Sequence, residues 1–143
     1  MTENILFNQG YNCCQAVLAE YASRLELPAP EAFRIGAAFG AGMGRRGHIC
    51  GAVSGALIVI GLRFCSFDPE DLATRDLVYS HTQRFMERFK SEYGSLYCRD
   101  LLGRDFFIPG QYELARQEQL FDRSCPSYVN GAIEILAEHF SFR

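Results

Sequence analysis

The sequence predicts an all-α fold, and three observations support this prediction. Apolar residues recur at helical spacing along most of the chain, all five prolines stand where that spacing breaks, and no stretch alternates with the period of two typical of a strand. The chain has 143 residues without a linker, repeat or low-complexity segment, so we expect one helical domain over residues 1–143. Its periodic segments predict about five to seven helices.

The first two helices follow from apolar periodicity and from capping residues. One helical face carries Cys14, Val17, Leu18, Tyr21 and Leu25. Asn12 is the expected N-cap of this helix, and Pro28 and Pro30 end the segment. A second helix is expected to begin at Pro30 and to continue through residues 31–39. The glycine-rich residues 40–47 are expected to form a loop before the third helix, because glycine permits positive φ.

The third helix is expected to begin at Cys50 and to end near Phe64. Small residues recur along it with a spacing of four, which favours close packing of another helix on that face: Gly51, Ala52, Gly55 and Ala56. Asp68 and Pro69 predict the N-cap and first residue of a long helix that ends near Tyr93.

Three more helices complete the predicted fold. A short helix is expected over residues 96–102, and a weaker one over residues 111–120. Pro126 is expected to open the last helix, because proline is favoured at a first helical position. The apolar stripe of that helix comprises Val129, Ile133, Leu136 and Phe140.

Composition narrows the classes of function. The chain contains 12 Phe and 7 Tyr residues, which supply apolar surface for a folded core, and its net charge of −3 argues against nucleic-acid binding. No signal peptide is recognisable at the N-terminus, and no apolar stretch is long enough to cross a bilayer. We therefore expect a cytoplasmic protein without membrane insertion, in which the six cysteines are normally reduced.

The six cysteines divide into four and two according to their predicted helical positions. Four lie at or next to predicted helix N-termini: Cys13, Cys50, Cys98 and Cys125. Unpaired amides and the helix dipole at such positions are expected to lower a thiol pKa, as redox chemistry and metal ligation both require. Cys65 falls at a helix C-terminus and Cys14 on an apolar face, so both are interpreted as packing residues. The alternative for all six is that a buried cysteine acts as a small apolar side chain.

The glycine-rich segment carries a weaker signal. Residues 42–47 match the pattern G-x-G-x-x-G, and Asp68 follows about 20 residues later, but no strand precedes the pattern, so a dinucleotide site is not favoured. With Arg45, Arg46 and His48 nearby, the segment could hold an anion; the alternative is a tight turn that lets helices approach each other.

These features together resemble a known family. The residues that carry the resemblance are GYNC at 10–13, GAGMG at 40–44, CGAVSGAL at 50–57, CRDLLG at 98–103 and a late Cys125. They are similar to the C_GCAxxG_C_C family, whose members are described as putative redox-active proteins. The resemblance spans about residues 10–136 and implies a small helical protein with four characteristic cysteines, which correspond here to Cys13, Cys50, Cys98 and Cys125. Cys14 stands where relatives usually have a small residue such as Ala.

The resemblance and the positions of the cysteines leave three functions open. In the first, the protein performs thiol redox chemistry: Cys50 attacks or is oxidised, and another of the four, Cys125 being favoured, resolves the mixed disulfide. In the second, the same four thiolates ligate a transition metal or an iron–sulfur cluster. In the third, the chain is a helical interaction module with structural cysteines.

The identity of the partners is left open as well. Dithiol chemistry requires no cofactor. The resemblance implies partners linked to transporters, because genes of this family tend to lie near transporter genes. The long aromatic-rich helix is compatible with a homo-oligomer, although a core-facing side explains its aromatic residues equally well.

Overall fold

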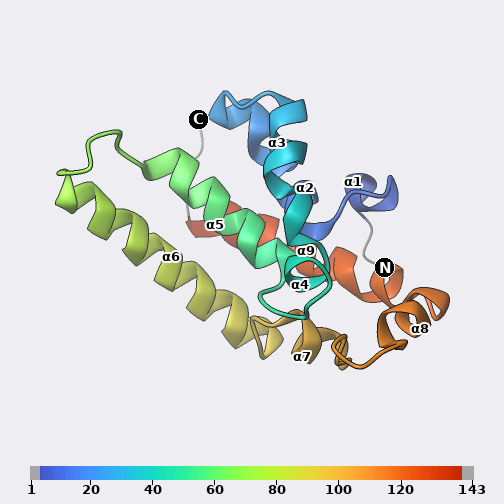
Figure 1. The fold of residues 1–143 in the computed structure, drawn as a ribbon. Coiled ribbons are helices and arrows are strands. Elements are labelled where there is room, and N and C mark those ends of the chain that lie inside the picture. Colours follow the sequence, from blue (N-terminus) through green and yellow to red (C-terminus); the bar gives the residue numbers. More distant parts are fainter. Residues whose placement is uncertain (1–3, 140–143) are drawn as a thin grey trace.

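The computed structural model describes residues 4–139. Within this range all regular secondary structure is helical, apart from one isolated bridge between Ile49 and Tyr97 (Figure 1). The α-helices are α1 (Ile5–Asn8), α2 (Cys13–Tyr21), α3 (Ala29–Gly36), α4 (Gly40–Met43), α5 (Gly51–Phe64), α6 (Leu72–Tyr93), α7 (Cys98–Leu102), α8 (Gln111–Gln117) and α9 (Leu120–His139). Two 3₁₀ turns, η1 (Ala22–Leu25) and η2 (Ala37–Phe39), extend α2 and α3. The predicted all-α fold is confirmed.

Helix α5 lies in the middle of the structure and packs against α2, α6 and α9 (Figure 1). Its first half, through Ala56, is buried on all sides. The small residues of this half allow α2 to approach closely, as their spacing predicts. A Cβ atom at Gly55 would lie only 2.8 Å from the carbonyl oxygen of Cys14. The start of α5 is therefore held against the start of α2, which brings two cysteine-bearing helix ends together.

The N-terminus of α2 has the expected cap. The Asn12 side chain accepts a hydrogen bond from the Gln15 amide at 2.9 Å, and the Gln15 side chain accepts one from the Asn12 amide at 2.9 Å, which forms a capping box. Asn12 also donates to the carbonyl oxygen of Gly36 at 3.1 Å and so ties the end of α3 to the same point. Cys13 is consequently fixed as the first residue of α2.

The long helix begins three residues later than the sequence predicts. Asp71, not Asp68, is the N-cap of α6, and its carboxylate accepts hydrogen bonds from the amide and hydroxyl of Thr74 at 3.0 and 2.8 Å. Asp68 accepts from the Glu70 amide in the preceding turn. Aspartate is a residue type favoured at an N-cap, so both positions are suitable. At Asp71 the residue three positions further on is Thr74, which donates to the carboxylate through both its amide and its hydroxyl.

The last helix begins earlier than predicted. It starts at Leu120, so Pro126 lies inside α9 and does not open it. Packing of aromatic rings stabilises the extra turn: the Phe121 ring centroid lies 5.7 Å from that of Phe106 and 5.5 Å from that of Tyr112. These contacts compensate for the stability that is lost because Pro126 has no amide hydrogen and cannot donate a helical hydrogen bond. Phe140, the last residue of the predicted stripe, lies outside the described residues.

The glycine-rich segment is a strained, compact turn. It opens with the single turn α4, in which two non-glycine residues and Gly42 have left-handed backbone conformations. The non-glycine residues are Ala41 (φ 51°) and Met43 (φ 65°), and Arg45 (φ 70°) follows just after α4. Hydrogen bonds from the Arg45 amide to Gly40 and from the Gly47 amide to Ala41 hold this conformation.

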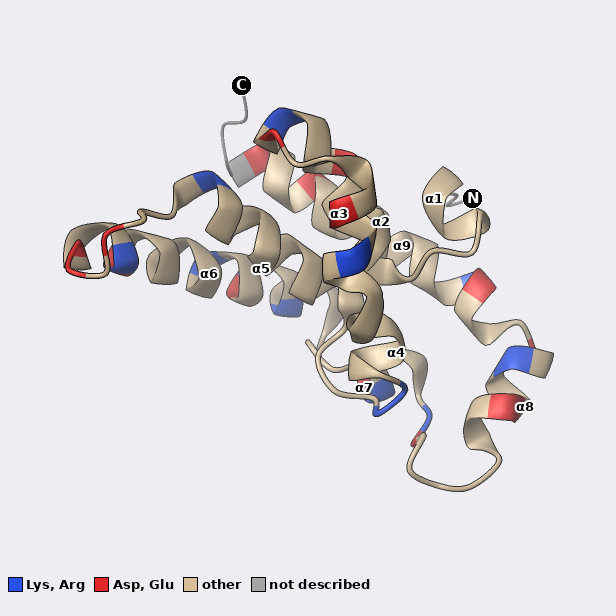
Figure 2. Cartoon of the chain, turned by 45° about the horizontal axis from the view of Figure 1, so that its top comes forward, with Lys and Arg blue, Asp and Glu red and all other residues tan. Residues whose placement is uncertain are grey.

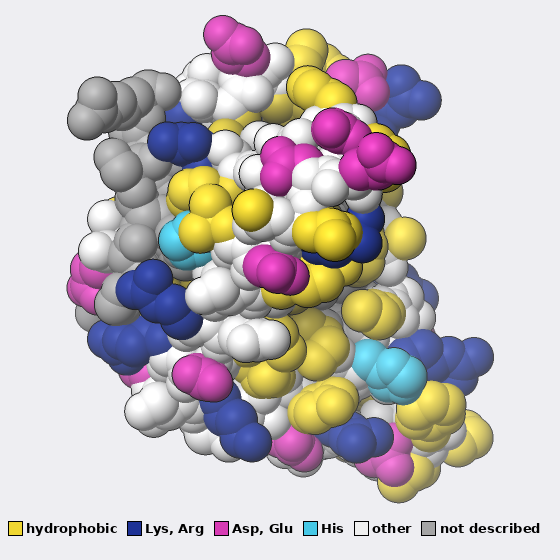
Figure 3. Space-filling view, turned by 90° about the vertical axis from the view of Figure 1, so that its left-hand side faces the viewer, with side chains coloured by type: hydrophobic (Ala, Val, Ile, Leu, Met, Phe, Trp, Pro, Cys, Tyr) yellow, Lys and Arg dark blue, Asp and Glu magenta, His cyan; other side chains and the backbone are white. Residues whose placement is uncertain are grey.

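Charged side chains of both signs are distributed over the helices (Figure 2). On the face shown in Figure 3, apolar side chains are interspersed with acidic and basic ones. No helix in the described part of the chain combines the length and apolar character needed to cross a membrane.

Candidate functional site

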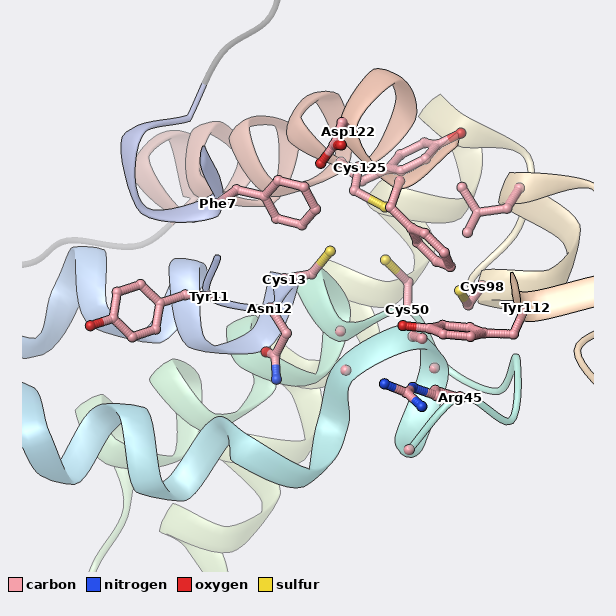
Figure 4. Close-up of a pocket in the computed structure, with 18 of the residues that line it drawn as sticks. Phe7, Tyr11, Asn12, Cys13, Arg45, Cys50, Cys98, Tyr112, Asp122 and Cys125 are labelled. Carbon is pink, nitrogen blue, oxygen red and sulfur yellow. The ribbon is translucent and has the colours of Figure 1, made fainter. Parts of the chain in front are cut away.

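Four cysteines from four separate elements line one cavity of about 780 Å³. Figure 4 shows them gathered around a common space: Cys13 opens α2, Cys50 is the N-cap of α5, Cys98 opens α7 and Cys125 lies inside α9. All four residues are buried, with exposed fractions of 8%, 4%, 6% and 5%. The structure thus brings together the four cysteines that the sequence singles out, although they are spread over most of the chain.

A short antiparallel pairing of two loops places Cys50 beside Cys98. The Cys50 amide donates to the carbonyl oxygen of Leu96 at 2.8 Å, and the Cys98 amide donates to that of His48 at 2.7 Å. These bonds flank the isolated bridge between Ile49 and Tyr97. The pairing joins segments far apart in sequence, and no period-two pattern marks either of them, so the sequence gives no signal for it.

The glycine-rich turn packs directly on Cys98. A Cβ atom at Gly42 would lie 2.7 Å from the Cβ atom of Cys98 and 2.6 Å from the His48 amide nitrogen. Gly51 makes a similar close approach on the other side, where a Cβ atom would lie 3.1 Å from that of Cys13. Glycine is therefore needed at positions 42 and 51, because a side chain at either position would displace the neighbouring cysteine.

The surroundings of Cys13, Cys50 and Cys98 raise the pKa of each thiol and so favour its protonated form, contrary to the expectation of lowered pKa values. Burial raises the pKa of the Cys50 thiol to about 12, although the amides of Ala52 and Val53 in the first turn of α5 act in the opposite direction. Burial also raises the pKa of Cys98, and negative charge on Cys50 and Cys125 adds to the effect. The prediction from helix N-termini is wrong in sign because the loss of solvation outweighs the helix dipole.

Cys125 affects the ionisation of Cys13. A hydrogen-bonding interaction with Cys125 is the largest effect on the Cys13 thiol and raises its pKa, ahead of burial. The sequence predicts Cys125 at a helix N-terminus. This prediction is wrong, because α9 begins at Leu120 and Cys125 lies inside it. Its side chain reaches the cavity from the interior of the helix. Negative charge on Cys125 also raises the pKa of Cys13, Cys50 and Cys98, although other causes, such as burial, have larger effects on each thiol.

The two remaining cysteines lie outside this cluster. Cys14 is completely buried, and burial raises the pKa of its thiol to about 12, in agreement with a packing role. Cys65 is exposed at the C-cap of α5, so its interpretation as a packing residue is wrong. All six cysteines are free thiols in this structure.

Sequence reasoning missed two tyrosines of the cavity, Tyr112 and Tyr128. Tyr128 follows Cys125 by one helical turn and anchors its hydroxyl on the Leu101 carbonyl oxygen at 3.1 Å. Its helical spacing from Cys125 is a signal that could have identified it. Tyr112 also lines the cavity, beside Arg45 of the glycine-rich segment, and no sequence signal links these two distant residues. His48 is exposed and lies beside Phe107, with ring centroids 6.3 Å apart.

The donor set suits a soft metal, since all four cavity cysteines offer sulfur. Across residues 4–139, however, no group of three or more His, Cys, Asp or Glu side chains is arranged so that it could hold a metal ion. The thiols face one cavity without forming the tetrahedral arrangement of a closed metal site.

Comparison with known proteins identifies the family of this chain. The searches of curated proteins and of solved structures each returned no match. A family model described as "Putative redox-active protein (C_GCAxxG_C_C)" matches residues 11–139, a range that contains all four cavity cysteines. The chain therefore belongs to the C_GCAxxG_C_C family.

Proposed function

We propose that this protein exchanges electrons with disulfides through the four-cysteine cluster, and that Cys13 and Cys125 form its dithiol/disulfide couple. The observation that carries the proposal is the convergence of four buried cysteines on one cavity, where Figure 4 shows the Cys13 and Cys125 side chains pointing into the same space. Two neighbouring thiols can lose two electrons and two protons by forming one disulfide bond.

Cys50 is the attacking thiol in this proposal. The amides of Ala52 and Val53 act on its sulfur and favour the thiolate, even though burial keeps the pKa high. A thiolate is the nucleophile in disulfide exchange. The Cys50 thiolate attacks a disulfide RSSR, forms a mixed disulfide Cys50–S–S–R and releases one thiolate RS⁻, which takes up the proton that Cys50 lost.

Cys125 and then Cys13 complete the exchange. Cys125 loses its proton and attacks the Cys50 sulfur, which releases the second RS⁻, and this thiolate takes up that proton. Cys13 then loses its proton and attacks Cys125, which returns Cys50 as a thiol and leaves a Cys13–Cys125 disulfide. Overall two protein thiols are oxidised and RSSR is reduced to two RSH. Cys125 is suited to the middle position because its side chain faces the same space as those of Cys13 and Cys50 (Figure 4).

Serine substitutions test this order. Reduced protein is mixed with excess disulfide, and the loss of free thiols is followed with the release of RSH. Cys50→Ser should abolish the fast reaction, Cys125→Ser should stop it at a mixed disulfide on Cys50, and Cys13→Ser should stop it at a Cys50–Cys125 disulfide. Cys65→Ser is the matched control and should react as the unsubstituted chain does. Unchanged kinetics in Cys50→Ser and Cys125→Ser would overturn the proposal.

A second candidate function uses the same thiols to hold a metal or an iron–sulfur cluster. It is favoured by one observation, the convergence of four buried thiols from four elements on one cavity. Metal analysis and a visible spectrum of anaerobically purified protein decide between the two. Bound metal in a stoichiometric amount, lost in Cys50→Ser and kept in Cys65→Ser, would support the second candidate. Colourless, metal-free protein that still exchanges with disulfides would support the first.

A further inference from the structure

We propose that the cysteine cavity takes a small anionic disulfide and that Arg45 recognises the negative charge of this substrate. This inference rests on the proposed disulfide exchange and adds the substrate class to it. Arg45 would act as a specificity-determining residue at the same cavity, without taking part in electron transfer.

The cavity has the size of a small-molecule site. Its volume of about 780 Å³ lies within the range of roughly 300–1,000 Å³ that such sites occupy. The four thiols line it with exposed fractions of only 4–8%. A disulfide on the surface of another folded protein would have difficulty in reaching sulfur atoms this deeply placed. A low-molecular-weight disulfide can enter the cavity and present its own sulfurs to Cys50.

The charged groups around the cavity give it an excess of positive charge. Its charged lining residues are Arg45, Arg116 and Asp122, two cations against one anion. Among the ion pairs found within residues 4–139, none involves Arg45. Its guanidinium therefore keeps its hydrogen-bond donors available for a carboxylate, which it can bind in a bidentate manner.

Aromatic packing fixes the position of this guanidinium. The guanidinium carbon of Arg45 lies 4.2 Å from the ring centroid of Tyr112, which also lines the cavity. Figure 4 shows the guanidinium beside the Tyr112 ring, on the side of the cavity where Cys50 lies. The Tyr112 ring itself packs against Phe106 and Phe121, with centroids 6.0 and 5.5 Å away. Arg45 is thus placed in advance of binding, which lowers the entropic cost of holding an anion.

The backbone at Arg45 has a strained, left-handed conformation. Arg45 has φ 70°, and Ala41 and Met43 have φ 51° and 65° in the same turn. Such conformations of non-glycine residues are unfavourable, and strain of this kind is found preferentially at binding and catalytic sites. The neighbouring Arg46 does not line the cavity, and its guanidinium lies 5.0 Å from the Phe107 ring. Adjacent arginines in one turn thus have different surroundings, and only Arg45 faces the thiols.

The positive charge of Arg45 also reduces an electrostatic repulsion that arises during the reaction. A thiolate that attacks an anionic disulfide meets its negative charge, and the leaving RS⁻ is negative as well. The Arg45 guanidinium offsets this repulsion by pairing with a carboxylate of the substrate. The cavity should therefore favour an anionic disulfide over a cationic one, and the preference should weaken as salt screens the charges.

Two disulfides of opposite charge test the inference. The rate of RSH release is measured with glutathione disulfide, which carries carboxylates, and with cystamine, which is a dication. Arg45→Met keeps the long side chain and removes the charge. It should lower the ratio of the two rates about tenfold at low ionic strength, the size expected for loss of one charge-assisted hydrogen-bonding pair. Arg46→Met is the matched control and should leave the ratio unchanged, and Arg45→Lys should restore part of it.

A binding measurement separates this inference from the proposed function. S-methylglutathione carries the same carboxylates but has no reactive disulfide, and its affinity is measured by calorimetry. Binding that weakens in Arg45→Met and not in Arg46→Met supports anion recognition by Arg45, even if no exchange is seen, in which case the proposed function alone fails. An unchanged rate ratio in Arg45→Met, or binding equal in both variants, overturns the inference and leaves disulfide exchange intact.

Discussion

Cys13, the first residue of α2, and Cys125, in the interior of α9, line the same cavity, and Cys125 raises the pKa of Cys13 more than burial does. The two residues stand near opposite ends of the chain, so only the folded protein brings them together. The shared cavity supplies the proposed disulfide with two sulfurs from distant parts of the chain.

The approach of α5 to α2 is expected to fail when a methyl group is added at their contact. In Gly55→Ala the new Cβ atom would lie 2.8 Å from the Cys14 carbonyl oxygen and 3.1 Å from the Val17 Cβ atom, so the helices must separate. We expect a loss of about 1–3 kcal/mol in the free energy of unfolding, measured with urea. Gly61→Ala on the same helix meets no atom within 4 Å and should stabilise the protein by up to about 1 kcal/mol. Equal effects of the two substitutions would contradict close packing at Gly55.

The contact between the glycine-rich turn and Cys98 gives a second prediction. Gly42 and Gly44 both have left-handed backbone angles, φ 70° and 61°, so alanine strains both positions similarly. Only at Gly42 would the Cβ atom also collide with the Cys98 side chain, at 2.7 Å, and with the His48 amide. Gly42→Ala should therefore cost more stability than Gly44→Ala by about 1–3 kcal/mol, and it should slow disulfide exchange. Matching unfolding curves and matching exchange rates for the two variants would show that the turn does not position Cys98.

The rate of disulfide exchange should rise with pH over an unusually wide range. Burial raises the pKa of Cys50 to about 12 from the ordinary value of 9.0, so the thiolate remains a minor form far into the alkaline range. Below its pKa, the thiolate fraction increases about tenfold for each pH unit. The observed rate constant should keep rising above pH 9, where that of an exposed thiol levels off. Circular dichroism at each pH provides the control for folding. A plateau at or below pH 9 would rule out attack by a thiol with the environment of Cys50.

Local sequence signals predict most of the helices, and for most of the cavity cysteines they predict the position at the start of a helix. The capping pair Asn12 and Gln15 fixes the start of α2, and the small residues of α5 identify the face that meets α2. Both features depend on residues within a few positions of one another. They place Cys13 and Cys50 at helix starts, as predicted, and the family resemblance selects the same cysteines.

The misplaced features depend on contacts between distant segments. Packing of Phe121 on Phe106 and Tyr112 extends α9 past Pro126, which places Cys125 inside the helix. The raised pKa of Cys50 depends on the burial that the assembled helices produce, whereas the helix dipole is visible from the sequence alone. Periodicity and capping rules describe neither effect. The same holds for the position of Arg45 over Tyr112.

Disulfide mapping tests the central claim most directly. The reduced protein is oxidised with an excess of a small disulfide, its free thiols are counted and alkylated, and the product is mapped by peptide mass spectrometry. The proposed mechanism predicts that the six free thiols fall by two, and that the new bond joins Cys13 to Cys125 within one chain. No loss of thiols, or a product in which Cys14 or Cys65 forms the disulfide, would contradict it.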